Sequence, residues 1–180
     1  ISIFKVVYNI MKKKIAILGS TGSIGKTLIN ILKKNKSEFE VLLLTSNTNY
    51  KELLKQVKIF KVKNIIINDY KTFLYIKKIL KNKKINIYND FENIQTIFKK
   101  KKIDYTMSAV TGFNGLKPTI DIIKFTKKIA IASAYGMAAT AINSDKFATI
   151  NKPALNKCQL RYLVLRSLNP PSHLMIKKIM

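Results

Sequence analysis

A glycine-rich segment near the N-terminus has the residue types and spacing that suit phosphate binding. It reads Gly19-Ser20-Thr21-Gly22-Ser23-Ile24-Gly25. Glycine lets the backbone turn sharply and approach a diphosphate closely. If a helix begins at this turn, its free N–H groups and the positive end of its dipole face the phosphates. The segment therefore predicts a nucleotide-binding loop, with a plain strand-to-helix turn as the alternative.

The flanking residues favour the nucleotide-binding interpretation. The apolar run Ile15-Ala16-Ile17-Leu18 comes just before the glycines and is typical of a buried strand. The stretch from Lys26 to Leu32 follows them, with apolar residues at helical spacing. Strand, glycine turn and helix is the order that a dinucleotide-binding fold requires.

The same alternation continues along most of the chain. Apolar stretches predict strands at 14–18, 40–45, 64–67, 85–88, 104–108 and 129–132. Helical periodicity predicts helices at 24–34, 50–60, 71–80, 91–100 and 115–125, with Asp69 and Asp90 as N-caps of the third and fourth. This pattern predicts an α/β fold: a Rossmann-like, doubly wound parallel sheet with helices on both faces. Ligands of such sheets bind at the carboxyl ends of the strands.

Length and composition fit one main domain of 180 residues, 47% of them hydrophobic. The single cysteine, Cys158, excludes an internal disulfide and suits a reducing compartment. No apolar run approaches the roughly 20 residues that cross a bilayer, and we predict no signal peptide. Because Met11 directly precedes the first lysine cluster, we expect residues 1–10 to be an upstream extension of a chain that starts at Met11. The alternative is that they extend a strand.

The net charge of +25 first suggests a nucleic-acid partner. The lysines gather at the ends of predicted elements, as in Lys33-Lys34, Lys77-Lys78 and Lys127-Lys128. Cations near helix C-termini complement the helix dipole and stay solvated. We therefore expect only non-specific attraction to polyanions at low salt, and keep a nucleic-acid-associated protein as the alternative.

The alternating pattern fails after about residue 133. The remaining segment holds both arginines, Arg161 and Arg166, together with Cys158 and His173. Its composition predicts that 133–180 is an atypical tail, either disordered or derived from a frameshift, joined to a nucleotide-binding domain at 11–132. We expect Cys158 to be inert and His173 to be solvent-exposed, so neither is a catalytic or metal-ligating candidate.

The end of the second predicted strand indicates which dinucleotide is preferred. NAD-binding folds place an acidic residue there to hold the ribose 2′-hydroxyl. Here the residues are Leu44-Thr45-Ser46-Asn47-Thr48-Asn49, without a carboxylate, and Lys51 adds positive charge. Small hydroxyl and amide side chains can donate hydrogen bonds to a 2′-phosphate. This favours NADP over NAD, unless the residues simply form a turn.

A second glycine-bearing segment follows the fifth predicted strand, from Ser108 to Thr119. A loop here would face the same strand ends as the first loop. Gly115 and Pro118 are typical of a helix start. The segment either borders the nicotinamide side of a cofactor or is an ordinary loop-to-helix corner.

These motifs together resemble the N-terminal domain of the 1-deoxy-D-xylulose 5-phosphate reductoisomerase family. The resemblance rests on Lys14 to Gly25, Ser108 to Thr119 and Lys128-Ile129-Ala130-Ile131-Ala132. It implies an NADPH-dependent, cytoplasmic or plastid-type enzyme of non-mevalonate isoprenoid biosynthesis. Such enzymes convert 1-deoxy-D-xylulose 5-phosphate to 2-C-methyl-D-erythritol 4-phosphate with Mg²⁺ or Mn²⁺, usually as homodimers.

The resemblance also implies residue roles. In the loop bounded by Gly19 and Gly25, it assigns the cofactor phosphates to Thr21, Gly22, Ser23 and Ile24. It places the adenosine 2′-phosphate at Asn47, Thr48 and Asn49, of which only Asn49 matches the common family form.

Two departures from the family bear on activity. Ser133-Ala134-Tyr135-Gly136 stands where the family has Asn-Lys-Glu-Ser, so the substrate-binding lysine is absent. The family's Asp-Ser-Glu metal motif has no counterpart either, since Ser144-Asp145 is followed by a lysine. We therefore assign no catalytic or metal-binding residues and expect the chain alone to be inactive. Another NADP-dependent reductase, such as a semialdehyde dehydrogenase, is a further alternative, but Cys158 lacks a matching setting for the nucleophile.

Overall fold

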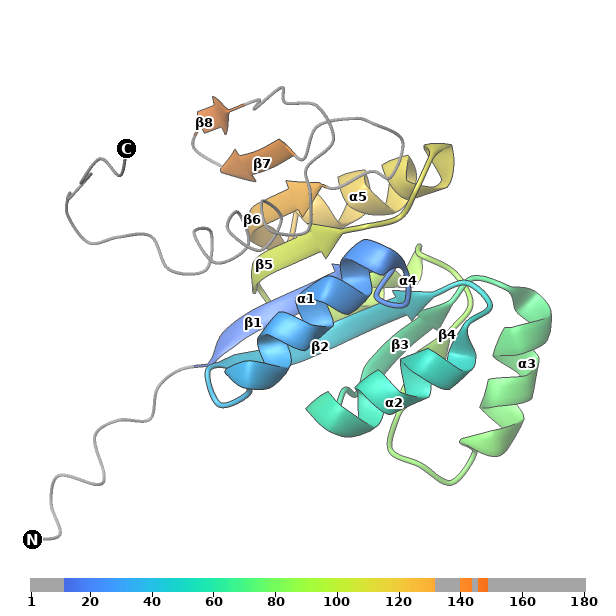
Figure 1. Cartoon of the computed structure of the whole chain (residues 1–180). Coiled ribbons are helices and arrows are strands. Elements are labelled where there is room, and N and C mark those ends of the chain that lie inside the picture. The colour runs from blue at the N-terminus through green and yellow to red at the C-terminus, as the bar shows by residue number, and fades with distance from the viewer. Residues whose placement is uncertain (1–11, 132–139, 144–145, 149–180) are drawn as a thin grey trace, which may run out of the picture.

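The computed structural model describes residues 12–131, 140–143 and 146–148, which form one sheet flanked by helices (Figure 1). The strands are β1 (Lys13–Leu18), β2 (Phe39–Ser46), β3 (Asn64–Ile67), β4 (Asn86–Tyr88), β5 (Ile103–Ser108), β6 (Thr126–Ile131), β7 (Thr140–Asn143) and β8 (Lys146–Ala148). The helices are α1 (Ser23–Lys34), α2 (Tyr50–Phe60), α3 (Tyr70–Ile79), α4 (Asn93–Phe98) and α5 (Leu116–Ile123), with a short 3₁₀ turn, η1 (Phe113–Gly115), before α5.

The strand order is β4-β3-β2-β1-β5-β6-β7-β8. The strands from β1 to β6 pair in parallel, whereas β7 pairs antiparallel with β6 and β8 with β7. The chain therefore runs outward from β1 through β4 and then returns to place β5 on the other side of β1. This reversal is the topological switch point, where doubly wound sheets bind their ligands.

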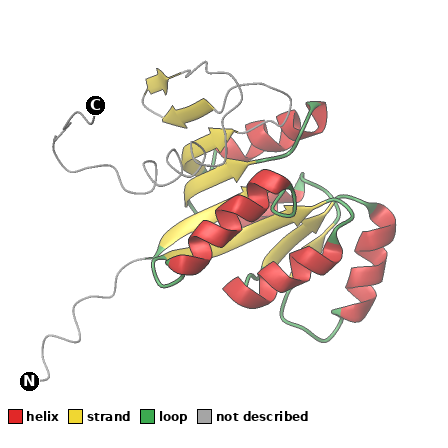
Figure 2. Ribbon diagram, in the orientation of Figure 1, coloured by secondary structure: helices red, strands yellow, loops and turns green. Residues whose placement is uncertain are grey.

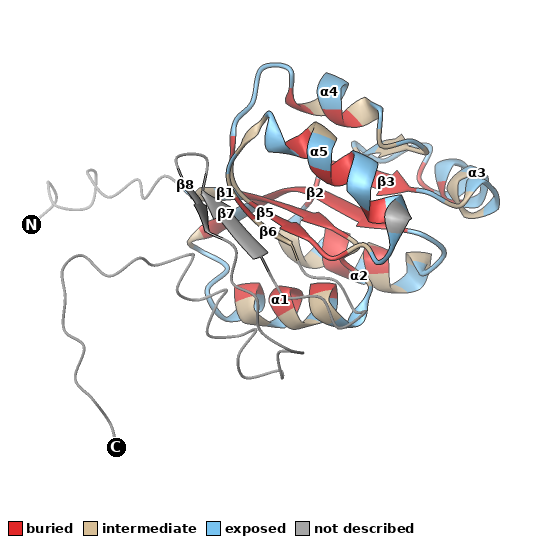
Figure 3. Cartoon of the chain, turned by 90° about the horizontal axis from the view of Figure 1, so that it is seen from above, coloured by how far each residue is buried: buried red, intermediate tan, exposed pale blue. Residues whose placement is uncertain are grey.

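Helices cover both faces of the parallel sheet, as the alternating pattern predicts (Figures 2 and 3). On one face, α1, α2 and α3 contribute Leu28, Leu53 and Ile76 to a core with Ile15 and Ile65. On the opposite face, α4 and α5 contribute a second core, whose helix residues are Ile94, Phe98 and Ile122. The sheet is apolar on both sides because buried parallel strands have no solvent-facing side. The predicted fold class is confirmed.

Most predicted elements are present within two or three residues of their expected ends. The prediction for Asp69 is confirmed, because its carboxylate accepts hydrogen bonds from Thr72 N at 2.8 Å and Thr72 Oγ1 at 2.7 Å at the start of α3. These bonds hold the pKa of Asp69 below its usual value. Pairs of lysines close α1 and α3, as expected for cations at helix C-termini.

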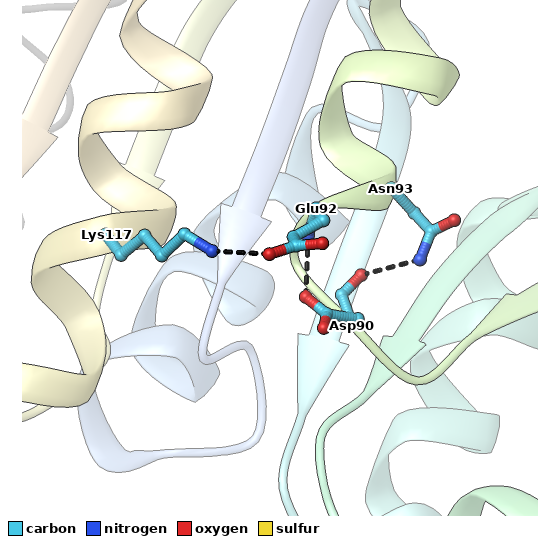
Figure 4. Close-up of polar contacts among 4 residues, drawn as sticks. All are labelled: Asp90, Glu92, Asn93 and Lys117. Atoms are coloured by element: carbon cyan, nitrogen blue, oxygen red, sulfur yellow. Dashed lines mark hydrogen bonds and ion pairs between the residues drawn. The ribbon is translucent and has the colours of Figure 1, made fainter.

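The prediction that Asp90 caps the fourth helix is wrong. Helix α4 begins at Asn93, with Glu92 at the N-cap position and no side-chain cap. Asp90 instead closes the preceding turn, where its carboxylate accepts from Glu92 N at 2.7 Å and its carbonyl from Asn93 Nδ2 at 3.1 Å (Figure 4). An aspartate favours local turns as readily as helix caps, so the sequence did not distinguish them.

The hairpin of β7 and β8 lies in the segment that composition set apart as a tail, and the sequence pattern did not predict it. The expected upstream extension at 1–10 and the rest of 133–180 lie outside the described residues, so the proposed boundaries stay predictions. Within the described ranges, no helix is long and apolar enough to cross a membrane.

Candidate functional site

The loop after β1 requires glycine at its first position. Gly19 has a φ of +74°, a left-handed conformation that side chains rarely adopt. A Cβ atom there would lie 2.7 Å from the carbonyl oxygen of Ala109, which follows β5. Ala109 N also donates to Leu18 O at 2.9 Å, so the ends of β1 and β5 are held together at the switch point.

The last glycine of the motif lets helix α1 approach the loop. A Cβ atom on Gly25 would lie 2.6 Å from the Cα atom of Ser20 and closer still to the carbonyl oxygen of Gly19. The middle glycine is different, since a Cβ atom on Gly22 would meet only Gly19 O at 3.5 Å. Gly19 and Gly25 are therefore required by packing, whereas Gly22 is exposed at the N-cap of α1.

Three amides of the loop are used by the protein itself. Gly19 N donates to Thr45 Oγ1 at 2.8 Å, and Ser20 N donates to Thr45 O at 2.9 Å. Gly22 N donates to Gly19 O at 3.2 Å. The first two bonds attach the loop to β2, and the third closes a turn within the loop. Gly19 therefore shapes the loop and does not supply a free donor.

The remaining amides are available at the start of α1. The first hydrogen bond of the helix runs from Lys26 N to Gly22 O at 2.9 Å, so Ser23, Ile24 and Gly25 have no acceptor within the helix. Gly22 provides no side-chain cap, and the first turn holds no acidic residue. Free donors, the positive helix end and exposed positions at Gly22 and Ser23 fit an anionic group such as a diphosphate.

The end of β2 lies beside this loop. Thr21 Oγ1 and Ser46 Oγ are 2.9 Å apart and share a hydrogen bond. Asn47 and Thr48 follow as exposed residues, and Asn49 caps α2 by accepting from Glu52 N at 3.3 Å. The Asn49 side chain still has its amide group to donate, so the segment can offer donors to a phosphate.

The segment after β5 faces the same strand ends, as the sequence predicts. Gly115 lies against this loop, since a Cβ atom on it would be 2.6 Å from Val110 O. Ser108 Oγ and Thr119 Oγ1 are 2.6 Å apart, which ties the start of α5 to the end of β5. Gly112 is exposed with a φ of +69° and open space around it. Because Ala109 lies against Gly19, the two glycine loops are neighbours at the carboxyl ends of β1 and β5.

The described residues contain no group of three or more His, Cys, Asp or Glu side chains placed to hold a metal ion. Cys158, His173 and Ser144-Asp145 lie outside those residues. Asp104, at the opposite end of β5, is an ordinary structural carboxylate that accepts from Lys14 N and Lys127 Nζ, each at 2.8 Å.

Sequence reasoning missed two residues that support the loop. Thr45 is 1% exposed and accepts both the Gly19 and the Ser20 amides. Gln56 is fully buried on α2, and its Nε2 donates to Ser20 O at 3.0 Å. A signal was present for Gln56, because it lies beside Leu53 and Val57 on the apolar face of a helix, where an uncharged polar residue needs a partner.

Fold and loop together define a Rossmann-like α/β domain with an uncapped helix N-terminus at its switch point. A family model described as 1-deoxy-D-xylulose 5-phosphate reductoisomerase matches residues 15–137. The chain belongs to the 1-deoxy-D-xylulose 5-phosphate reductoisomerase family.

Individual relatives agree with the family model. The enzyme from Pelagibacter ubique is 57% identical over 122 residues, which cover 67% of this chain and 31% of the relative. The solved enzyme from Zymomonas mobilis in complex with NADPH is 27% identical, with a TM-score of 0.60 over 68% of this chain and 32% of that one. A solved magnesium complex, 22% identical with a TM-score of 0.60, shares the fold over 68% of this chain and 31% of its own. The chain thus spans about a third of the length of the curated relatives it matches.

Proposed function

We propose that this chain is the NADPH-binding part of a 1-deoxy-D-xylulose 5-phosphate reductoisomerase. The observation that carries the proposal is the uncapped start of α1, where the amides of Ser23 and Ile24 have no acceptor among the described residues, in a chain that matches this family over 15–137. The family match favours this function over a nucleic-acid-associated protein or another NADP-dependent reductase.

Within this proposal, each group of residues has a distinct role. The amides of Thr21, Ser23 and Ile24 hold the cofactor phosphates, and Gly22 keeps the approach free of side chains. Gly19 and Gly25 shape the loop. Asn47, Thr48 and Asn49 donate to the adenosine 2′-phosphate, with Lys51 exposed in the first turn of α2 as a source of positive charge. When bound, NADPH would supply the hydride for reduction of a sugar-phosphate substrate.

Other properties of the whole enzyme are carried over as part of the same proposal. They are a homodimer, a divalent Mg²⁺ or Mn²⁺ ion, and a location in a bacterial cytoplasm or a plastid-type organelle. Because Ala134 stands where the family has its substrate-binding lysine, we expect these 180 residues alone to bind cofactor without turning over substrate. Binding to nucleic acid is expected to be non-specific and to weaken with salt.

Calorimetry on the full chain tests the cofactor assignment. The titrations use NADPH, NADH and ATP at physiological ionic strength, about 0.15 M, where non-specific attraction to the +25 charge is screened. We expect NADPH to bind more tightly than NADH, because only NADPH has the 2′-phosphate. ATP controls for simple polyanion binding. Equal affinity for NADPH and NADH, or no binding of NADPH, would refute the assignment.

A further inference from the structure

The buried amide of Gln56 supports the loop after β1, but no role in cofactor binding has been assigned to it so far. Its side chain is fully buried, and Nε2 donates to Ser20 O at 3.0 Å and to Glu52 Oε1 at 3.3 Å. Both neighbours are acceptors, so the amide orientation is determined: Nε2 must face them. Its Oε1 atom then has no hydrogen-bond partner within the part of the chain that the structure describes. Burying the Oε1 atom without a hydrogen-bond donor costs free energy. A role of the Nε2 donor would offset this cost.

That donor holds one particular peptide group. The Ser20 carbonyl and the Thr21 N–H belong to the same peptide unit, and the described chain contains no cis peptide bond. In a trans peptide the carbonyl and the N–H point in opposite directions. Because Gln56 binds the Ser20 carbonyl, the Thr21 N–H must point away from Gln56 and the buried face of α2.

Further hydrogen bonds to β2 hold Ser20 and Thr21 in place. Ser20 N and Ser20 Oγ both donate to Thr45 O, at 2.9 Å and 3.2 Å, and Ser20 is fully buried. The Thr21 hydroxyl bonds to Ser46 Oγ. The Thr21 N–H donates to no acceptor among the described residues, so it remains available to a ligand. Among these contacts, Gln56 is the one that sets the rotation of the peptide between Ser20 and Thr21.

We propose that Gln56 is a positioning residue for the cofactor: its contact with Ser20 O aims the Thr21 amide at the cofactor phosphates. The inference rests on the proposed function, which it deepens. Helix α2 then serves both parts of the site, since Asn49 caps its N-terminus beside the 2′-phosphate position and Gln56 lies seven residues further on beside the diphosphate loop.

Two substitutions separate the donor from the shape of the side chain. Gln56→Met keeps a similar volume and removes the donor, and Gln56→Glu keeps the shape but places a carboxylate against the Ser20 carbonyl. Gln95→Met is the matched control, because Gln95 is exposed on α4, far from the loop in sequence. All variants are made in the full chain, and thermal unfolding identifies any that fails to fold. If Gln56→Glu does not fold, Gln56→Met still decides the question.

The measurements are cofactor affinity and the direction of one bond. In Gln56→Met, we expect affinity for NADPH to fall about three- to tenfold. This factor corresponds to the free energy of the one hydrogen bond that holds the loop in its binding conformation. Affinity for NADH should fall by the same factor, because both cofactors share the diphosphate. Residual dipolar couplings of the cofactor-free chain should show a reoriented Thr21 N–H bond, which a general loss of stability would not produce. Gln95→Met should match wild type in each measurement.

The possible outcomes distinguish this inference from the proposed function. Unchanged NADPH affinity and an unchanged Thr21 coupling in Gln56→Met would overturn the role of Gln56 while leaving NADPH binding intact. Failure of the wild-type chain to bind NADPH would overturn the proposed function and, with it, the positioning of a cofactor. A reoriented Thr21 amide together with weakened binding of both cofactors supports the inference.

Discussion

Gly25 lies so close to Ser20 that a Cβ atom on Gly25 would come within 2.6 Å of the Ser20 Cα atom. This contact joins the first turn of α1 to the loop that precedes it. Both partners are main chain, so neither can rotate away as a side chain could. The free amides at the start of α1 therefore keep a fixed position relative to the ends of β1 and β2.

Replacement of Gly25 by alanine should consequently destabilise the fold. For Gly25→Ala we expect a loss of about 2–3 kcal/mol in the free energy of unfolding, because the backbone must shift to admit the methyl group. Gly22→Ser is the control, since Gly22 has a φ of −73° and its Cβ position is 3.5 Å from Gly19 O. Its effect on stability should stay within about 0.5 kcal/mol. Urea denaturation measures both, and equal losses would contradict the packing argument.

The hydroxyl of Thr45 supports the loop from β2. Thr45→Val keeps the shape of this buried side chain but leaves Gly19 N without its acceptor at 2.8 Å. We expect the free energy of unfolding to fall by about 1–2 kcal/mol. Thr96→Val, on the exposed side of α4, makes the same chemical change without a buried partner and should have little effect. A similar change in both variants would show that the hydrogen bond is not the cause.

Asn49 offers a test of cofactor preference that spares the fold. Asn49→Asp keeps an oxygen that can accept from Glu52 N at the N-cap of α2, so stability should be preserved. The added negative charge repels a 2′-phosphate, and we expect NADPH affinity to fall about tenfold. NADH affinity should not fall, because NADH lacks that phosphate and its ribose 2′-hydroxyl can donate to the new carboxylate. Calorimetry with both cofactors measures the ratio, and an unaltered ratio would place the 2′-phosphate elsewhere.

The lowered pKa of Asp104, which lies at the opposite end of the sheet, predicts that the stability of the fold depends on pH. Burial favours its neutral form, but hydrogen bonds from Lys127 and Lys14 N, with the charges of both lysines, outweigh burial and lower the pKa of Asp104 below its usual 3.8. A lowered folded-state pKa stabilises the protein above the unfolded-state pKa. That stabilisation is lost as the pH falls through the folded-state value.

Asp104→Asn should therefore be less stable than wild type at neutral pH by about 1 kcal/mol, a modest figure because solvent screens the exposed Lys127 partner. The difference should shrink as the pH falls from about 4, where the carboxylate of the unfolded chain takes up a proton, through the lower pKa of the folded state. Glu40→Gln, on an exposed position of β2, removes the same unit of charge and controls for the high net charge. Urea denaturation across this pH range provides the measurement. A difference that stays constant with pH would exclude Asp104 as its source.

The sequence by itself determined the elements and the class of fold. Apolar runs and repeats of 3.6 residues are local properties, so the strands from β1 to β6 and the helices could be predicted from windows of a few residues. The glycine turn could be predicted as well, because Gly19, Gly22 and Gly25 lie within one short segment between a strand and a helix. The role of Asp90 was predicted wrongly, because an aspartate side chain suits both a helix N-cap and a tight turn.

Only the tertiary structure decided which groups of the loop are free to bind a ligand. Thr45 and Gln56 are 26 and 36 residues away from the groups that they hold, Gly19 N and Ser20 O. Such contacts depend on how α2 packs against the sheet and on the register of β1 with β2, which no local pattern encodes. The antiparallel pairing of β7 with β6 likewise depends on a partner strand and not on periodicity. The local pattern specifies a strand, a turn and a helix, but the direction of each amide follows from long-range packing.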